Sequence, residues 1–215
     1  MNRREIVDKI ERDGLVAVVR AESADQAIRI SEACIEGGVA AIELTYTVPG
    51  ANAIIEQLAG RYKPEEIIVG AGTVLDSVTA RMAILSGAKY VVSPALDEGV
   101  TQMCQTYQIA VMPGAMTLKE MIDAMRAGAD IVKMFPGDIL GPAMIKAAHG
   151  PLPQLRIMPT GGVDVNNAAA WIKAGAVALG AGSSLTGGAK TGDYAKITET
   201  AKRFIEQIKL ARGQA

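Results

Sequence analysis

The sequence is poor in aromatic residues, histidine and cysteine, and each shortage excludes a class of protein. It holds one histidine, His149, and two cysteines, Cys34 and Cys104. A single histidine, placed in a His-Gly-Pro turn, supplies neither a histidine-rich zinc site nor a plausible Ser-His-Asp triad. The cysteines stand far apart and lack metal-type or redox-type spacing. We therefore expect them to be small buried thiols of a protein in the reducing cytoplasm.

An excess of one charge and long apolar runs are also missing. The formal net charge is −1, without a basic block, which argues against nucleic acid as a partner. No apolar run approaches the roughly 18 residues of a membrane-spanning helix. The charged start of the chain is also unlike the apolar region of a signal peptide. The sequence therefore predicts a cytoplasmic protein with no membrane partner.

The sequence is rich in small and aliphatic residues. Hydrophobic residues make up 49% of the chain although only 4% of it is aromatic, and there are 23 glycines. The core must therefore consist of alanine, valine, isoleucine, leucine and methionine. This composition is typical of an α/β protein with close helix–sheet packing and many tight turns.

A short apolar strand, a turn, an amphipathic helix and a glycine-containing stop recur along the chain. The predicted strands span residues 15–20, 40–44, 67–70, 89–92, 109–112, 131–136, 155–158 and 176–179. The helices that follow them span residues 23–36, 50–60, 75–86, 97–107, 117–128, 142–148, 165–173 and 194–211. A small helix over residues 3–11 precedes the first strand.

Strands that alternate with helices form a parallel sheet with right-handed crossovers. Eight such units without a Pro- or Ser-rich linker predict one domain over residues 1–215. We expect a (β/α)8 TIM barrel with a short extra N-terminal helix. An open doubly wound sheet is the alternative, but no G-x-G-x-x-G motif follows the first strand.

The sixth predicted strand, Ile131 to Pro136, carries a single cation among apolar residues. Because strand side chains alternate, Lys133 shares a face with Ile131 and Phe135. Burial disfavours the ammonium form of a lysine, which is how an amine becomes a nucleophile near neutral pH. The alternative is a lysine at a strand end whose stem reaches out to solvent.

Barrel enzymes place their sites at the carboxyl ends of the strands, which supplies further candidates. Glu43 is a second charge inside an apolar strand, and with Lys133 it would provide the carboxylate and amine of imine chemistry. The alternative for Glu43 is an ion pair that merely closes the barrel end. Other strand-end candidates are Arg20, Thr47, Thr73, Pro94, Phe135 and Thr160.

Glycine-rich turns follow the last two predicted strands, at Gly161-Gly162 and at Gly182-Ser183. Such turns expose backbone N–H groups to an anion, and loops at these two places often hold phosphate in barrels. Each turn alone could be only a tight turn. Together they predict a phosphate site.

Over essentially its whole length, the chain resembles the bacterial aldolases of the 2-keto-3-deoxy-6-phosphogluconate (KDPG) and 4-hydroxy-2-oxoglutarate (KHG) group. The matching motifs are Ile42-Glu43-Leu44-Thr45, Gly70-Ala71-Gly72-Thr73-Val74, Val92-Ser93-Pro94, Met112-Pro113-Gly114, Lys133-Met134-Phe135-Pro136 and Pro159-Thr160-Gly161-Gly162. Their combination and order make the resemblance specific.

The resemblance implies a class I aldolase that cleaves KDPG, an intermediate of the Entner–Doudoroff pathway, to pyruvate and glyceraldehyde 3-phosphate. It also implies cleavage of 4-hydroxy-2-oxoglutarate to pyruvate and glyoxylate. Family members use no cofactor or metal and are typically homotrimers. Carried over by position, Lys133 forms the Schiff base and Glu43 is the general acid and base.

The resemblance implies binding roles as well. Thr73 would contact the pyruvate carboxylate, Phe135 and Pro94 would wall the pocket, and Thr160 would tune substrate preference. The phosphate would be held by Gly161, Gly162 and Ser183.

One position departs from the family pattern. Many members carry an arginine four residues after the glutamate, where this chain has Thr47. Arg20, at the end of the first strand, could supply the missing guanidinium, unless it is a surface arginine. This departure leaves the preferred keto acid open, including the galactonate epimer of KDPG.

Two other functions fit the same architecture. One is a phosphate-binding barrel isomerase or synthase that works by acid–base chemistry without an imine. The other is a sugar-phosphate-binding regulator without catalysis. The isomerase or synthase would form no covalent adduct with pyruvate, and the regulator would bind ligand without turnover.

Overall fold

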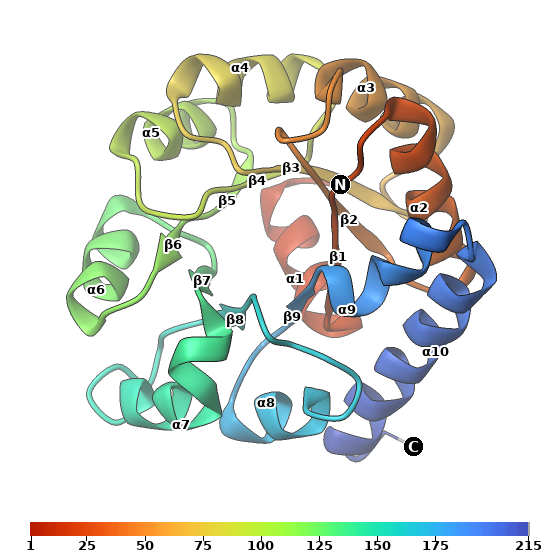
Figure 1. Ribbon diagram of the computed structural model, residues 1–215. Helices are drawn as coiled ribbons and strands as arrows, with labels where there is room; N and C mark the ends of the chain where they lie inside the picture. The colour runs from red at the N-terminus through yellow and green to blue at the C-terminus, as the bar shows by residue number, and fades with distance from the viewer. Residues whose placement is uncertain (215) are drawn as a thin grey trace.

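The computed structural model describes residues 1–214, in which the strands gather at the centre with helices around them (Figure 1). Six strands of this part form one curled parallel sheet. Their spatial order is β5 (Ala110–Met112), β4 (Tyr90–Val92), β3 (Ile68–Gly72), β2 (Ala41–Thr45), β1 (Leu15–Val19) and β9 (Leu179–Ala181). The first and last strands of the chain are therefore neighbours, as a sheet that curls back on itself requires.

Three more strands of the described part form a second parallel group, β6 (Gly114–Ala115), β7 (Val132–Met134) and β8 (Ile157–Pro159). Pro113, which has no N–H for a ladder, lies between β5 and β6. On the other side, a single bridge joins Thr160 to Gly180 of β9. The expected parallel α/β fold is confirmed. The expected eight continuous strands are seen only in part, because the pairing is interrupted at these two places.

The helices lie outside the strands and follow the expected order. They are α2 (Ala24–Glu36), α3 (Ala51–Arg61), α4 (Ser77–Leu85), α5 (Glu98–Thr106), α6 (Leu118–Ala127), α7 (Gly137–His149), α8 (Ala168–Ala174) and α10 (Tyr194–Ala211). Short polar side chains satisfy free backbone N–H groups at several helix starts. Thr117 is one of them, and with Glu120 it forms the capping box that begins α6.

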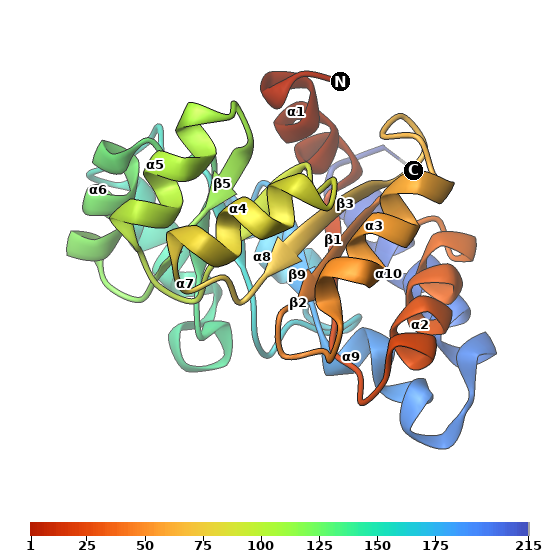
Figure 2. The same cartoon turned by 90° about the horizontal axis from the view of Figure 1, so that it is seen from above.

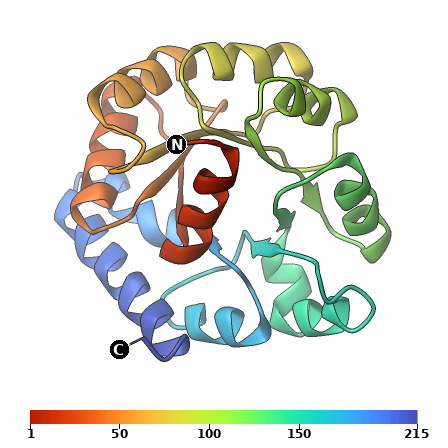
Figure 3. The ribbon, with the colours of Figure 1, turned by 180° about the vertical axis from the view of Figure 1, so that it is seen from behind.

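Helix α1 (Arg3–Asp13) covers one end of the strands. It begins with a capping box between Asn2 and Glu5, and its buried face consists of Ile6, Val7 and Ile10. Arg3 fixes the helix to the strands through Asp130, with 2.9 Å between Nη2 and Oδ2. Figure 3 shows α1 over the middle of the strands, and Figure 2 shows it at the end opposite to α9 (Ser183–Thr186).

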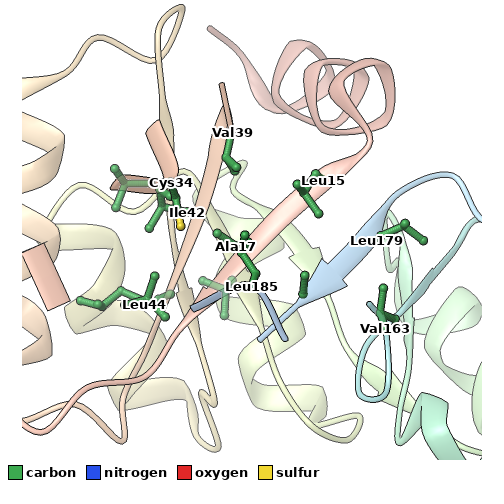
Figure 4. Close-up of a cluster of buried hydrophobic side chains, with 14 of the residues drawn as sticks. Leu15, Ala17, Cys34, Val39, Ile42, Leu44, Val163, Leu179 and Leu185 are labelled. Carbon is green, nitrogen blue, oxygen red and sulfur yellow. The ribbon is translucent and has the colours of Figure 1, made fainter. Parts of the chain in front are cut away.

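The core has two apolar layers. The larger layer lies between the strands and the helices and includes Ile42, Leu44 and Cys34 (Figure 4). The smaller layer lies among the strands and under α1, and it includes Val16, Ile68, Tyr90, Met112 and Met158. Alternate residues of each strand therefore enter different layers, as strand geometry requires. Both cysteines are buried and free, as expected.

Two details differ from the expectation. Helix α7 begins at Gly137 instead of residue 142, because a first turn precedes a kink at Gly141, whose φ is 69°. Helix α9 and the 3-10 helix η1 (Gly187–Thr191) were not predicted, since short glycine-rich segments show no helical periodicity. No helix within residues 1–214 is long and apolar enough to cross a membrane.

Candidate active site

Lys133 and Glu43 are the two charged side chains that enter the interior of the strands, and they meet there. Lys133 is 3% exposed and Glu43 is 0% exposed. Lys133 Nζ on β7 lies 3.8 Å from Glu43 Oε1 on β2, so the two form an ion pair across the strand ring. The strand-end alternative for Lys133, in which its stem reaches solvent, is therefore wrong. Each buried charge therefore has the other as its ionic partner, which offsets part of its lost hydration.

The position of Glu43 depends on a glycine in the neighbouring strand. A Cβ atom on Gly72 of β3 would lie 2.1 Å from Glu43 Oε1, which is far too close for two nonbonded atoms. Gly72 therefore leaves the space that the carboxylate fills. Neither carboxylate oxygen accepts a hydrogen bond from a residue in the described part of the chain. The carboxylate is held by packing and by Lys133, and it remains able to accept a proton.

Phe135 connects the buried pair to an open cavity. The centre of its ring lies 5.2 Å from Lys133 Nζ, and its side chain is half-buried. The same residue lines a cavity of about 190 Å³. The cavity is lined by Val18, Arg20, Phe135, Thr160, Gly161, Gly162, Val163, Asp164, Gly182, Ser183 and Ser184. Most of these residues directly follow β1, β8 or β9, which places the cavity at the carboxyl ends of the strands.

The glycine turn after β8 has a defined shape. Gly161 and Gly162 have φ values of 93° and 65°, which side chains rarely tolerate. Asn167 Nδ2 donates a hydrogen bond to the Gly162 carbonyl, and Ser184 Oγ donates one to the Val163 carbonyl. The two glycine-rich turns predicted to hold phosphate are thus tied together at one edge of the cavity.

A second cavity of about 620 Å³ adjoins the first and shares Arg20, Gly182 and Ser183 with it. Arg20 and Lys190, both exposed, are the cations in its lining. Lys190 was missed by the sequence reasoning because it belongs to η1, not to a strand end. A lone lysine in a glycine-rich loop carries no signal of its own.

Thr160 directly follows β8 and lines the smaller cavity. It is 6% exposed, and its Oγ1 has no hydrogen-bond partner among the described residues. A Cβ on Gly180 would lie 2.2 Å from this oxygen, so Gly180 makes the space for the hydroxyl. A buried hydroxyl without a partner is costly, which makes Thr160 available to a ligand group.

Three predicted residues, Thr47, Thr73 and Pro94, do not line either of these cavities. Thr47 Oγ1 lies 2.7 Å from Thr45 Oγ1, in a hydrogen bond. Thr73 has a φ of 58°, which is uncommon for a residue with a side chain and is often found at functional sites. These residues follow β2, β3 and β4, on the Glu43 side of the ring.

A parallel α/β fold with an amine–carboxylate pair buried among its strands, next to a cation-lined cavity, is an arrangement typical of an enzyme. The family model for KDPG and KHG aldolase matches residues 6–200. The 2-dehydro-3-deoxy-phosphogluconate aldolase of Treponema pallidum (strain Nichols) is 31% identical over 207 residues, which cover 94% of this chain and 97% of that protein.

Another relative is the 2-dehydro-3-deoxy-6-phosphogalactonate aldolase of Escherichia coli (strain K12). It is 33% identical over 172 residues, which cover 80% of this chain and 83% of that protein. A solved structure described as native KDPGal has a TM-score of 0.86 at 29% identity, with 93% of this chain and 96% of that chain covered. The chain therefore belongs to the KDPG and KHG aldolase family, and it is a carbon–carbon lyase.

The space left by Gly72 gives a first prediction. In Gly72→Ala, the new methyl group would displace the Glu43 carboxylate, and we expect kcat/KM to fall by about 100-fold because small misplacements of a reacting group are costly. Steady-state aldolase assays measure this. Gly60→Ala is the matched control, since a Cβ there meets open space on α3. Full activity of Gly72→Ala would contradict a role for the Glu43 position.

Proposed function

We propose that the protein is a class I aldolase that cleaves KDPG to pyruvate and glyceraldehyde 3-phosphate through an imine on Lys133. We propose cleavage of 4-hydroxy-2-oxoglutarate to pyruvate and glyoxylate as a second activity. The observation that carries the proposal is the buried pair, with Lys133 Nζ 3.8 Å from Glu43 Oε1. An amine nucleophile and an adjacent proton acceptor are the two groups that imine-based aldol cleavage needs.

In this proposal, the Lys133 amine attacks the C2 carbonyl of the keto acid, and loss of water gives a positively charged imine. Glu43 accepts the proton of the C4 hydroxyl while the C3–C4 bond breaks, and the bonding electrons pass into the imine to form an enamine. Glyceraldehyde 3-phosphate leaves. Glu43 then returns its proton to C3, and water hydrolyses the imine to release pyruvate and the free amine.

The cavity beside the pair supports the placement of the rest of the substrate. Gly161, Gly162, Gly182 and Ser183 would hold the phosphate, near the charge of Arg20. Phe135 borders both the amine and the cavity, which suits a residue that walls the substrate chain. From the resemblance, Pro94 would complete this wall.

On the Glu43 side of the ring, Thr73 would bind the pyruvate carboxylate. The role rests on the resemblance, and its left-handed backbone fits a functional position. Thr47 would border the same end of the substrate. No residue role in this proposal calls for a cofactor.

A 2-keto-3-deoxy-6-phosphogalactonate aldolase is the second candidate. The specific observation in its favour is the 33% identity to the phosphogalactonate aldolase of E. coli. Thr160, whose buried hydroxyl is unpaired beside the cavity, is the residue we expect to discriminate between the C4 epimers. A steady-state comparison of both epimers with wild type and Thr160→Val distinguishes the two candidates.

We also infer that the strands close into one (β/α)8 barrel that forms a single domain. The support is that β5 and β6 are separated only by Pro113, and that the Thr160–Gly180 bridge joins the other edge of the second group to β9. The two buried, free thiols suit the cytoplasm that we propose as its location.

We propose a homotrimer as the working assembly, with α4 in its interface. Leu75, Val78, Met82 and Leu85 are between 45% and 69% exposed. Their spacing of three or four residues aligns them along α4 and the short segment that precedes it. A contiguous exposed apolar stripe of this kind usually marks an interaction surface.

The imine gives the second prediction. After incubation with pyruvate and borohydride, intact-mass spectrometry should show a reduced pyruvyl adduct that maps to Lys133. Lys133→Ala should show none, whereas Lys146→Ala, which removes an exposed lysine of α7, should keep the adduct. Absence of the adduct in wild type would leave the acid–base isomerase or synthase as the better reading.

Arg20 gives the third prediction. Arg20→Ala should lower kcat/KM for KDPG by about 10- to 100-fold, because a hydrogen bond to a charged group contributes about 1.5–3 kcal/mol. Arg203→Ala on the exposed face of α10 is the control. Assays with unphosphorylated 4-hydroxy-2-oxoglutarate show whether the loss follows the phosphate. Unchanged kcat/KM would mean that Arg20 does not replace the arginine missing at Thr47.

The α4 stripe gives the fourth prediction. Light scattering of wild type should give three times the chain mass of 22.4 kDa. Charges placed in the stripe by Val78→Glu and Leu85→Glu should release monomers, because buried unpaired charges oppose association. Leu210→Glu, an exposed leucine of α10, should leave the mass unchanged. A monomeric wild type would contradict the proposed trimer.

A further inference from the structure

Tyr90 is a fully buried phenol that the proposed mechanism does not use. It lies on β4 inside the strand ring, at 0% exposure, and its hydroxyl has no hydrogen-bond partner among the described residues. Burying a hydroxyl without a partner costs free energy, whereas phenylalanine would fill the same space without that cost. An orphaned group of this kind points to a role outside packing.

The strand register places Tyr90 in one row with Glu43. Glu43 of β2 pairs with Gly70 of β3, and the adjacent pairing of Ala71 with Val91 puts Gly70 beside Tyr90. A Cβ on Gly70 would lie 2.4 Å from Cζ of the Tyr90 ring. The end of the ring that carries the hydroxyl therefore covers Gly70, the residue that separates Tyr90 from Glu43.

The surroundings leave few other polar groups for this hydroxyl. Tyr90 packs in the apolar layer with Ile68, Val92 and Met112. The charged groups on the elements around this layer are Glu43 on β2, Lys133 on β7 and those of α1. On α1, Arg3 pairs with Asp130, Arg4 with Asp8, Lys9 and Arg12 with Asp13, and Glu11 with Arg156, while Glu5 belongs to the capping box. All four cations of α1 therefore already have a carboxylate partner. Glu43, with two oxygens that accept no hydrogen bond, is the acceptor available in the same row as Tyr90.

The phenol remains protonated over the working range of an enzyme. Burial raises the pKa of Tyr90 well above its usual value, and the negative charge of Glu43 raises it further. The side chain is therefore a hydrogen-bond donor throughout, not a base. The hydroxyl and the Glu43 carboxylate lie on either side of Gly70 and are not hydrogen-bonded to each other in this structure. A donor that reaches a carboxylate stabilises its charged form, which is the form that accepts a proton.

We propose that Tyr90 is a positioning residue for Glu43, whose hydroxyl orients the carboxylate and favours its charged form during proton transfer. This inference rests on the proposed aldolase function. Gly70 and Gly72 serve the same arrangement, since one provides space for the ring and the other for the carboxylate. Tyr90 acts through Glu43 and does not itself contact the reacting carbon.

The test compares wild type with Tyr90→Phe in two assays on pyruvate alone. Borohydride trapping reports imine formation on Lys133, and exchange of the pyruvate methyl protons with D₂O, followed by NMR across a pH series, reports proton transfer by Glu43. In Tyr90→Phe we expect trapping to be unchanged and exchange to fall about tenfold near neutral pH, as loss of a hydrogen bond to a charged group predicts. On the acid side of the pH profile, the pH at which the exchange rate begins to fall should rise by about one unit, because the Glu43 carboxylate loses the Tyr90 hydroxyl as a donor.

The matched control is Tyr107→Phe, which removes a hydroxyl from an exposed tyrosine that stacks on Arg81. It should leave both assays at wild-type values. A Tyr90→Phe protein with wild-type exchange and an unchanged acid side of the pH profile would overturn the role of Tyr90 while leaving the aldolase proposal intact. Exchange that falls equally at every pH would also overturn it, since a packing defect has that effect. Wild type without trapping or exchange would instead overturn the proposed function.

Discussion

The structure depends on a pair of opposite charges placed where neither could remain alone. A single carboxylate or ammonium group inside an apolar layer would lose its hydration without compensation, at a cost of several kcal/mol. Lys133 and Glu43 come from β7 and β2, strands in different sheets, and only the curled arrangement of both groups brings them within 3.8 Å. The fold thus keeps an amine and a carboxylate together in its interior.

Space for this pair is made by residues that have no side chain. β3 contributes two glycines to the interior, and the positions of their missing Cβ atoms are filled by the Tyr90 ring and the Glu43 carboxylate. Gly180 of β9 plays the same part, because the Thr160 hydroxyl fills the space where a Cβ atom on Gly180 would lie. Three polar side chains are therefore seated against backbone, without a protein hydrogen-bond partner in the described part of the chain. Such a site is rigid in shape and still able to bond a ligand.

The buried chemistry and the exposed recognition surface are separate but adjacent. The cavities at the strand ends contain Arg20, Lys190 and two glycine-rich turns, whereas the buried pair lies in the interior, with the ring of Phe135 beside Lys133. Charges at an exposed cavity attract an anionic substrate from solution. The same charges would be too solvated to activate an amine, which needs the dry interior. In the proposed function, this division lets the protein combine binding of a charged substrate with imine chemistry.

The alternation of apolar strands with amphipathic helices predicted the parallel α/β fold, and isolated charges inside two apolar strands predicted that Lys133 and Glu43 belong to a site. These features are local, so the sequence by itself determined them. Only the tertiary structure decided that the two charges meet, that Pro113 interrupts the pairing, and that Tyr90 covers Gly70 beside Glu43. Such contacts join residues far apart in the chain, and they depend on register and curl, which no local pattern of side chains encodes.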